Sequence, residues 1–314
     1  MHKTIRFAFN VLPEIYLLYV CVCVAVRLTV RDHYAVGRLA FYAPILMLMG
    51  IGLIAVVAIL ARKKRRWLAL ACLPLMAVLV AFAVSDYQPQ NYILEQRGEP
   101  IKVFSWNIFH GALGWDDVLR EIKARDADII FITEAVGEDY SDRPGFWKEE
   151  FPDYEITDNS GEMDYIILVR GKIINQRFEV SNGLDVVCAE LQVRGRRLNV
   201  ILPHLSALPH RDSEAIYARL LAVIEAFPKD IPLLVSGDLN TPRNSLYIEQ
   251  MRQRLSSAYR EAGQGFGYSW PMPFPMWALD YTFVNEGLVV TKYELHGYML
   301  SDHAAQEITL AFKK

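Results

Sequence analysis

An acidic residue and an amide lie two positions apart after a short apolar run. The run is Ile231–Val235, and Asp238 and Asn240 follow it in the order Ser-Gly-Asp-Leu-Asn. A short apolar run bounded by turn residues is typical of a buried strand, and Pro242 cannot extend it because proline donates no ladder hydrogen bond. Open α/β sheets bind ligands at the carboxyl ends of such strands. The same residue types favour turns, so this segment alone leaves a plain turn open.

Acid, amide and imidazole side chains recur at the ends of other apolar runs. They are Asn107, Glu134, His204, Asp280, Asp302 and His303. A single glutamate at a strand end is usually solvated, and a single histidine is usually an ordinary surface or core residue. A whole set of such positions is hard to produce by accident. It predicts that these side chains converge on one rim, where they could act together.

Six short segments resemble the endonuclease/exonuclease/phosphatase superfamily in residue type and order. They are Ser105-Trp106-Asn107, Ile132-Thr133-Glu134, Pro203-His204-Leu205, Gly237-Asp238-Leu239-Asn240, Leu279-Asp280-Tyr281 and Ser301-Asp302-His303. The resemblance covers about residues 101–312 and is closest to bacterial members with membrane helices before the domain. It implies a four-layered α/β sandwich, two packed sheets flanked by helices, that hydrolyses phosphoesters with a divalent metal.

The resemblance also implies a metal site. Glu134, Asn107 and Asp302 would hold Mg²⁺ or Mn²⁺, because hard cations prefer carboxylate, amide and water oxygens. Such a metal polarises the phosphoryl oxygen and offsets charge in the transition state. We therefore expect activity to depend on a divalent cation.

The catalytic roles come from the same resemblance. Asp238 would orient or deprotonate the attacking water, and Asn240 would bind a phosphate oxygen. Asp280 would accept a hydrogen bond from His303 and favour its imidazolium form, which stabilises the pentacovalent phosphorus. His204 would protonate the leaving oxygen.

The elements that must position these groups alternate from residue 101 onward. Strands are predicted at 101–106, 127–133, 163–170, 173–180, 184–193, 197–202, 231–235, 281–284, 288–295 and 304–312, and helices at 115–125 and 212–227. Strands and helices in two successive halves indicate two sheets packed face to face, with helices outside.

The first 86 residues have a different composition. Three apolar runs, 7–26, 39–60 and 67–84, have about the length needed to span a bilayer. A signal peptide would explain one such run and a buried core helix is the other alternative. We predict three transmembrane helices in a membrane domain of residues 1–86, a linker at 87–100, and a catalytic domain at 101–314.

Charge sets the expected orientation and partners. The basic cluster Arg62–Arg66 should stay cytoplasmic, which places the catalytic domain outside the cytoplasm of a protein integral to the bacterial inner membrane; Lys3 and Arg6 conflict with this orientation. Of 33 basic and 36 acidic residues, 10 and 3 lie in residues 1–86, which leaves 23 and 33 and a net charge of −10 for the rest. Nucleic-acid binders carry basic stripes instead.

The sequence favours a membrane-anchored, metal-dependent phosphoester hydrolase, either a phosphodiesterase or a phosphatase. Membrane tethering and an acidic surface weakly favour phospholipid head groups, while nucleic acid and small phosphoesters stay open because fold does not fix substrate. The alternatives are an extracytoplasmic nuclease and a non-catalytic binding or signalling module on the same fold. The bilayer and the substrate are the expected partners, and no obligate protein partner is inferred.

Three features near these motifs have two interpretations each. The loop Trp270–Trp277 is rich in aromatic residues and proline, so it is either a lip for an apolar substrate or a rigid loop over its own core. His110 lies either near the site or, more simply, in a turn. Asp164 could pair with His204 or be an ordinary strand-end carboxylate.

Overall fold

The computed structural model describes residues 2–61, 66–89, 98–137, 145–157, 164–208 and 210–313. Four residues of the basic cluster, 62–65, and most of the predicted linker, 90–97, lie outside the described residues. The chain divides into two compact units, Met1–Tyr87 and Gln88–Lys314. The second unit contains every strand-end residue singled out above.

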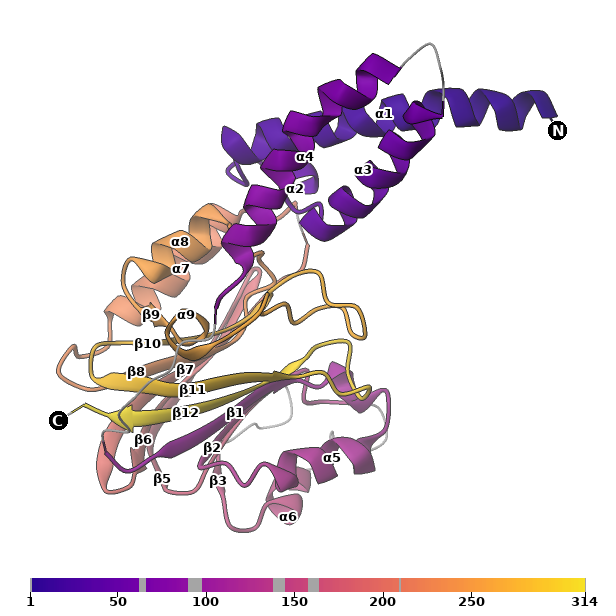
Figure 1. Ribbon diagram of the computed structural model, residues 1–314. Helices are drawn as coiled ribbons and strands as arrows, with labels where there is room; N and C mark the ends of the chain where they lie inside the picture. The colour runs from indigo at the N-terminus through magenta and orange to yellow at the C-terminus, as the bar shows by residue number, and fades with distance from the viewer. Residues whose placement is uncertain are drawn as a thin grey trace. The chain divides into compact units, whose positions relative to one another are not determined.

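The second unit contains two six-stranded sheets (Figure 1). The first sheet has the order β11-β12-β1-β2-β4-β3, with β1 Ile101–Asn107, β2 Ile129–Thr133, β3 Glu155–Ile156, β4 Tyr165–Val169, β11 Leu288–His296 and β12 Ala305–Phe312. The second has the order β5-β6-β7-β8-β10-β9, with β5 Lys172–Ser181, β6 Leu184–Val193, β7 Arg196–Leu205, β8 Leu233–Asp238, β9 Ser256–Ser257 and β10 Asp280–Val284. Both are mixed, because β1 and β2 are parallel, as are β7 and β8.

A continuous apolar core fills the space between the sheets. Val103, Phe131 and Ile167 from the first sheet share one buried cluster with Val187 and Leu202 from the second. The central strands are apolar on both faces because each outer face is also covered by helices. This packing confirms the predicted α/β sandwich of two sheets flanked by helices.

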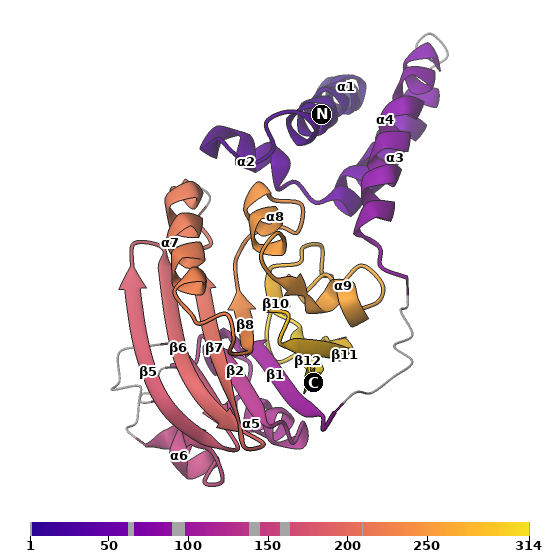
Figure 2. The ribbon, with the colours of Figure 1, turned by 90° about the vertical axis from the view of Figure 1, so that its left-hand side faces the viewer.

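The helices lie on the outer faces of the two sheets (Figures 1 and 2). Helices α5 (Trp115–Ala124) and α6 (Phe146–Glu150) bury their apolar side chains against the first sheet. Helices α7 (Ser213–Glu225) and α8 (Leu246–Arg252) pack on the second, and the short α9 (Ala258–Ala262) follows β9. The Asp212 carboxylate accepts a hydrogen bond from the Ala215 amide and thereby caps α7. Helices α6, α8 and α9 and the two-residue strands β3 and β9 were not predicted, since they are too short to show a periodicity.

The first unit contains the helices α1 (His2–Leu28), α2 (Ala35–Phe41), α3 (Ile45–Leu60) and α4 (Arg66–Asp86). By length and composition, the described residues include one helix able to cross a membrane, Val11–Leu28, or two if the pair α2 and α3, bent by 63°, forms one broken span. Cys72–Asp86 is a shorter apolar helix. The prediction of three transmembrane helices is therefore wrong for this part of the chain.

The break in the second apolar run has a local cause. Pro44 precedes α3 in an extended conformation, with φ −64° and ψ 128°. Proline lacks the amide hydrogen that a continuing helix needs, and it disfavours helical backbone in the residue before it. The run predicted as one helix over 39–60 is consequently divided into α2 and α3.

Candidate active site

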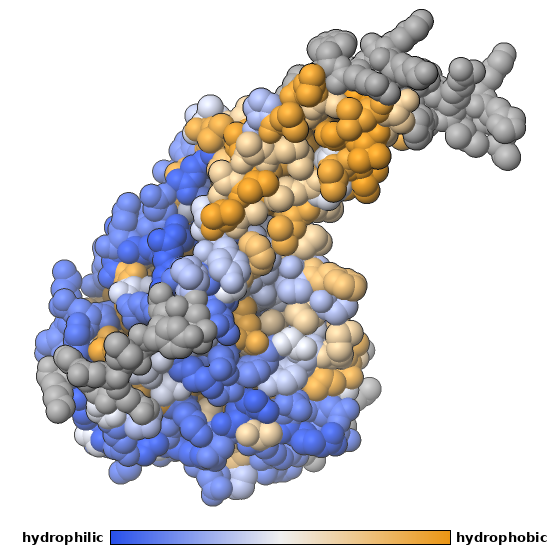
Figure 3. Space-filling view, in the orientation of Figure 1, coloured by the Kyte–Doolittle hydropathy of each residue, from blue (hydrophilic) through white to orange (hydrophobic). Residues whose placement is uncertain are grey.

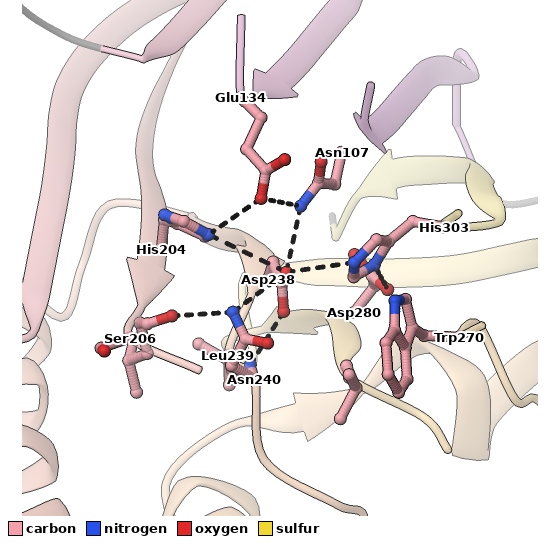
Figure 4. Close-up of polar contacts among 12 residues, drawn as sticks. Asn107, Glu134, His204, Ser206, Asp238, Leu239, Asn240, Trp270, Asp280 and His303 are labelled. Carbon is pink, nitrogen blue, oxygen red and sulfur yellow. Dashed lines mark hydrogen bonds and ion pairs between the residues drawn. The ribbon is translucent and has the colours of Figure 1, made fainter. Parts of the chain in front are cut away.

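The topology of both sheets brings the strand-end residues to one rim (Figure 4). In the first sheet, parallel β1 and β2 end side by side, with Asn107 paired to Thr133 and Glu134 next in the chain. In the second sheet, Asp238 at the end of β8 lies between two neighbours: it pairs with His204 on parallel β7 and with Asp280 on antiparallel β10. The strand ends of the two sheets face each other, so residues far apart in sequence, such as Asn107 and Asp238, come into contact.

A buried histidine lies between two aspartates at the centre of this rim. His303 Nδ1 is 2.8 Å from Asp280 Oδ2, and His303 Nε2 is 3.7 Å from Asp238 Oδ2. Burial by itself would lower the pKa of His303, but the Asp280 and Asp238 carboxylates outweigh it and raise the pKa to about 10. The ring is therefore an imidazolium at neutral pH. The Trp106 indole donates to the His303 carbonyl at 3.0 Å and fixes the segment against β1.

Asp238 is held rigidly and has an altered acidity. Its side chain is 1% exposed, and the Asn240 amide donates to its Oδ1 at 2.8 Å. Burial, followed by the Asp280 charge, raises the pKa of Asp238 to about 6, while His303 and His204 oppose the rise. A carboxylate of this kind is ionised at neutral pH yet is basic enough to take up a proton.

Asn240 is fixed by its own loop. Its backbone has a positive φ of 45°, and its Nδ2 donates to the Leu205 carbonyl at 2.8 Å and to Asp238 Oδ2 at 3.3 Å. Asparagine tolerates the left-handed region better than most residues. The amide side chain is thus locked beside Asp238, and both hydrogens of Nδ2 are already donated, so the predicted phosphate contact would require one of these two bonds to break.

Asn107 joins the two sheets across the rim. Its Nδ2 donates to Glu134 Oε1 at 2.9 Å and to Asp238 Oδ2 at 3.2 Å, while its Oδ1 accepts from the Phe109 amide. Glu134 itself has a positive φ of 52°. The amide nitrogen thus lies between two carboxylates, a place that also suits a cation.

Comparison with known proteins identifies the family. A family model described as the Endonuclease/Exonuclease/phosphatase family matches residues 104–303. The chain belongs to this family. No curated protein sequence matches the chain significantly.

Solved structures with the same fold cover about two thirds of this chain. The human Nocturnin catalytic domain is 21% identical and aligns over 68% of this chain and 94% of its own, with a TM-score of 0.55. The Bacteroides thetaiotaomicron mannosyl-6-phosphatase is 15% identical over 68% of this chain and 100% of its own, with a TM-score of 0.55. TDP2 from D. rerio, in complex with a single-strand DNA product, is 16% identical over 68% and 99%, with a TM-score of 0.53. At these identities the likeness shows the fold.

Enzymes of the endonuclease/exonuclease/phosphatase family hydrolyse phosphoesters and typically use divalent metals. Of the three expected ligands, Glu134 and Asn107 are joined by a hydrogen bond, whereas no hydrogen bond among the described residues joins Asp302 to either. Asp302 Oδ2 accepts from the Trp270 indole at 2.8 Å, whereas its Oδ1 is buried without a hydrogen-bond partner. Glu134 offers a second carboxylate, and oxygen donors of this kind suit Mg²⁺ or Mn²⁺. For Asn107 Oδ1 to bind the cation, the side-chain amide must flip, and Oδ1 then loses its hydrogen bond from the Phe109 amide.

Two groups of acidic and histidine side chains in the described part of the chain are tight enough to hold an ion. In the first, Asp238, Asp280 and His303, the imidazole is protonated and bound to Asp280, so it is a poor ligand. The second group consists of Glu294, His296 and Glu307. Lys292 lies 2.9 Å from Glu294 and Arg125 lies 3.6 Å from Glu307. These cations already offset the carboxylates, so we assign no metal there.

His110 and Asp164 lie beside the outer oxygen of Glu134. His110 Nε2 is 3.5 Å from Glu134 Oε2, and its Nδ1 donates to the Val136 carbonyl at 2.7 Å. Asp164 accepts from the Val136 amide at 2.7 Å and lies 3.5 Å from His110 Nδ1; burial raises its pKa. His110 thus fits both interpretations offered by the sequence, because it belongs to the 3-10 turn η2 (Phe109–Gly111) and also lies near the site.

His204 has partners that the sequence-based reasoning missed. Its Nδ1 contacts the Tyr165 hydroxyl at 3.0 Å, and Tyr165 donates to Asp185 at 2.8 Å. The suggested Asp164 partner contacts His110 instead. Asp185 lies directly opposite His204 on the antiparallel strands β6 and β7. A correct prediction of the register of this hairpin would therefore have placed Asp185 beside His204.

Proposed function

We propose that this chain is a divalent-metal-dependent phosphoester hydrolase, anchored to a membrane by its N-terminal helices. The observation that carries the proposal is the buried imidazolium of His303 between Asp280 and Asp238, facing Asn107 and Glu134 across the rim. A non-catalytic module would have no need for a buried charge cluster of this kind, because unpaired buried charges cost stability.

The chain's own residues supply the proton and charge chemistry. Asp238, whose pKa is near 6, can orient a water molecule and accept its proton at neutral pH. His303 donates through Nε2 to an oxygen of the phosphoryl group and offsets its developing negative charge. His204, whose Nε2 lies 3.9 Å from Asp238 Oδ2, would take up a proton from solvent at Nε2 and give it to the leaving oxygen. Asn240 would bind another phosphoryl oxygen through Nδ2, in exchange for its hydrogen bond to Leu205 or Asp238. A bound divalent cation, held by Glu134 and Asp302 with Asn107, would supply Lewis-acid polarisation of the phosphoryl oxygen.

An apolar rim beside the site supports a lipid substrate. Phe274, 79% exposed, and Met299, 67% exposed, lie on two loops that flank His303. Asp302 ties these loops together, since its side chain accepts from Trp270 and its carbonyl accepts from the Met272 amide at 2.8 Å. Figure 3 shows hydrophobic side chains gathered over these loops, on the right of the view.

Exposed apolar side chains beside a hydrolytic site favour a substrate whose phosphoester is attached to an apolar group. We therefore propose phospholipid head groups as the substrate class. The net charge of −10 outside residues 1–86 makes nucleic acid the second candidate. The Mannosyl-6-phosphatase and TDP2 comparisons show that this fold serves sugar phosphate and DNA substrates in other proteins.

The membrane anchor rests on the first unit. Val11–Leu28 is long and apolar enough to cross a bilayer, and only 17% of it is buried within the structure. The basic cluster Arg62–Arg66 should stay cytoplasmic. We propose that these N-terminal helices anchor the chain in the cell membrane, with the second unit outside the cytoplasm.

Metal dependence is the direct test. The purified full chain should hydrolyse vesicle-borne phosphodiesters with Mg²⁺ or Mn²⁺ and lose activity with a chelator. Glu134→Gln should weaken Mn²⁺ binding, measured by electron paramagnetic resonance, because a charged oxygen ligand becomes a neutral amide. Glu294→Gln is the matched control and should bind Mn²⁺ like the unaltered protein. Unchanged Mn²⁺ affinity of Glu134→Gln would overturn the metal assignment.

A further inference from the structure

A chain of hydrogen bonds crosses from one sheet to the other behind His204. Tyr165, the first residue of β4, extends from the first sheet to the second, where its hydroxyl lies 2.8 Å from Asp185 Oδ2 and 3.0 Å from His204 Nδ1. Asp185 and His204 are directly opposed on β6 and β7. Tyr165 is buried, and its ring lies 5.2 Å from the imidazole ring, centroid to centroid.

The chemistry of the three groups fixes the direction of these hydrogen bonds. The Asp185 carboxylate only accepts, so the single hydroxyl proton of Tyr165 points to it. Burial, followed by the Asp185 hydrogen bond, raises the pKa of Tyr165, so the phenol keeps that proton. Toward His204 the phenol oxygen can then only accept, which requires a hydrogen on Nδ1.

The other ring nitrogen of His204, Nε2, is not used in a hydrogen bond within the described part of the protein. Nε2 is buried without a hydrogen-bond partner and lies 3.8 Å from Glu134 Oε1 and 3.9 Å from Asp238 Oδ2. In Figure 4 it points into the space enclosed by Glu134, Asn107 and Asp238. A buried nitrogen without a hydrogen-bond partner lowers the stability of the fold. At this rim, the same nitrogen is available to contact a bound substrate.

We propose that Tyr165 and Asp185 are positioning residues, which hold His204 with hydrogen on Nδ1 and with Nε2 directed at the reacting phosphoester. The proposal rests on the proposed function only for the role of Nε2, the nitrogen that takes up a proton from solvent and then gives it to the leaving oxygen. A histidine held by one ring nitrogen has a single tautomer and ring orientation. Asp280 does the same for His303 through Nδ1, so the rim contains two imidazoles, each oriented by a carboxylate, one directly and one through a phenol.

The tautomer can be measured without any substrate. The full chain, labelled with ¹⁵N-histidine, should show neutral His204 with hydrogen on Nδ1 and none on Nε2, both with Mg²⁺ and with a chelator. His204→Gln assigns the signals among the seven histidines. Tyr165→Phe should move the signals toward a mixture of tautomers. A predominant Nε2–H form of His204 in the unaltered protein would overturn the proposal.

Kinetics separate positioning from mere support of the fold. Tyr165→Phe keeps the ring and removes the hydroxyl, and it should lower kcat about 10- to 100-fold with KM within about threefold. Tyr154→Phe is the matched control, because Tyr154 is also buried and its hydroxyl donates to a backbone carbonyl, that of Ala127, at 2.7 Å. Its kcat should be unchanged.

Two further variants complete the test. Tyr165→Phe added to His204→Gln should cause no further loss of kcat, since its effect passes through the imidazole. Asp185→Asn retains an acceptor for the phenol and should lose less than Asp185→Leu. An equal loss from Tyr165→Phe with and without His204 would show a structural role and refute the proposal. If the unaltered protein hydrolyses no phosphoester, the proposed function fails, and the tautomer measurement still decides the positioning.

Discussion

Asp280→Asn should convert His303 from a permanent cation into a group that titrates near neutral pH. The substitution keeps the shape of the side chain and removes the charge that lies 2.8 Å from Nδ1. With Asp280 neutral, burial again disfavours the imidazolium, and only the more distant charges of Asp238 and Asp302 oppose it. We expect the pKa of His303 to fall from about 10 to its ordinary value of 6.5 or below.

The size of the effect follows from the protonated fraction. At pH 7.5 a group with a pKa of about 10 is almost fully protonated, whereas at a pKa of about 6.5 roughly one tenth remains protonated. Protonation alone then lowers kcat about tenfold, and the looser ring orientation adds about another tenfold. The expected loss at pH 7.5 is therefore about 100-fold.

The pH profile is the diagnostic measurement. Between pH 6.5 and 8.5 the unaltered enzyme should keep a nearly constant kcat, because His303 stays protonated and Asp238, with a pKa of about 6, stays ionised. In Asp280→Asn, kcat should fall about tenfold per pH unit above 7. Asp230→Asn, at an exposed loop position, is the control with an unchanged profile. A flat profile with unaltered kcat in Asp280→Asn would refute the role given to the dyad.

The remaining predictions concern the base, the rim and the anchor. Asp238→Asn should lower kcat about 10²–10⁴-fold. The raised pKa of Asp238 also means that its ionised form, which predominates above pH 6, destabilises the fold. The same variant should therefore unfold at a higher temperature than the unaltered protein at pH 8. Phe274→Ser should lower activity on vesicle-borne phosphodiesters about ten- to hundredfold more than on a small soluble one, because about 1.5–3 kcal/mol of aromatic burial is lost. Val180→Ser, at an exposed position of β5, is the control and should affect neither activity. Equal losses on both substrates would show that Phe274 supports the fold and does not bind lipid. If Arg62–Arg66 stays inside and the second unit lies outside, a reporter fused after Lys314 should work only when it functions outside the cytoplasm. A signal from a cytoplasmic reporter would reverse the proposed orientation.

The sequence alone determined which residues lie at the rim. Each one follows or precedes an apolar run, and a run of four to six apolar residues bounded by turn signals is legible without any partner. Parallel strands whose carboxyl ends meet then place Asn107 beside Glu134 and His204 beside Asp238. Such positions depend on local order along the chain, which is why the α/β sandwich and the polar residues at its rim could be predicted.

Only the tertiary structure decided which rim residue contacts which. Tyr165 belongs to the first sheet and His204 to the second, so no strand pairing or spacing predicts that they touch. Asp164, one residue before Tyr165, was considered for His204 and instead lies beside His110. Adjacent residues of a strand point to opposite faces, and a single-residue difference therefore changes which sheet a side chain meets.

The apolar N-terminal runs show the same division. Their composition is readable from the sequence, but the break at Pro44 and the 63° bend between α2 and α3 come from backbone geometry, which a count of apolar residues does not contain. The protonation of His303 likewise depends on two carboxylates brought within 4 Å by strands from different parts of the chain. Composition and periodicity are local properties, whereas electrostatic coupling depends on distance in space, and only the packed sheets fix that distance.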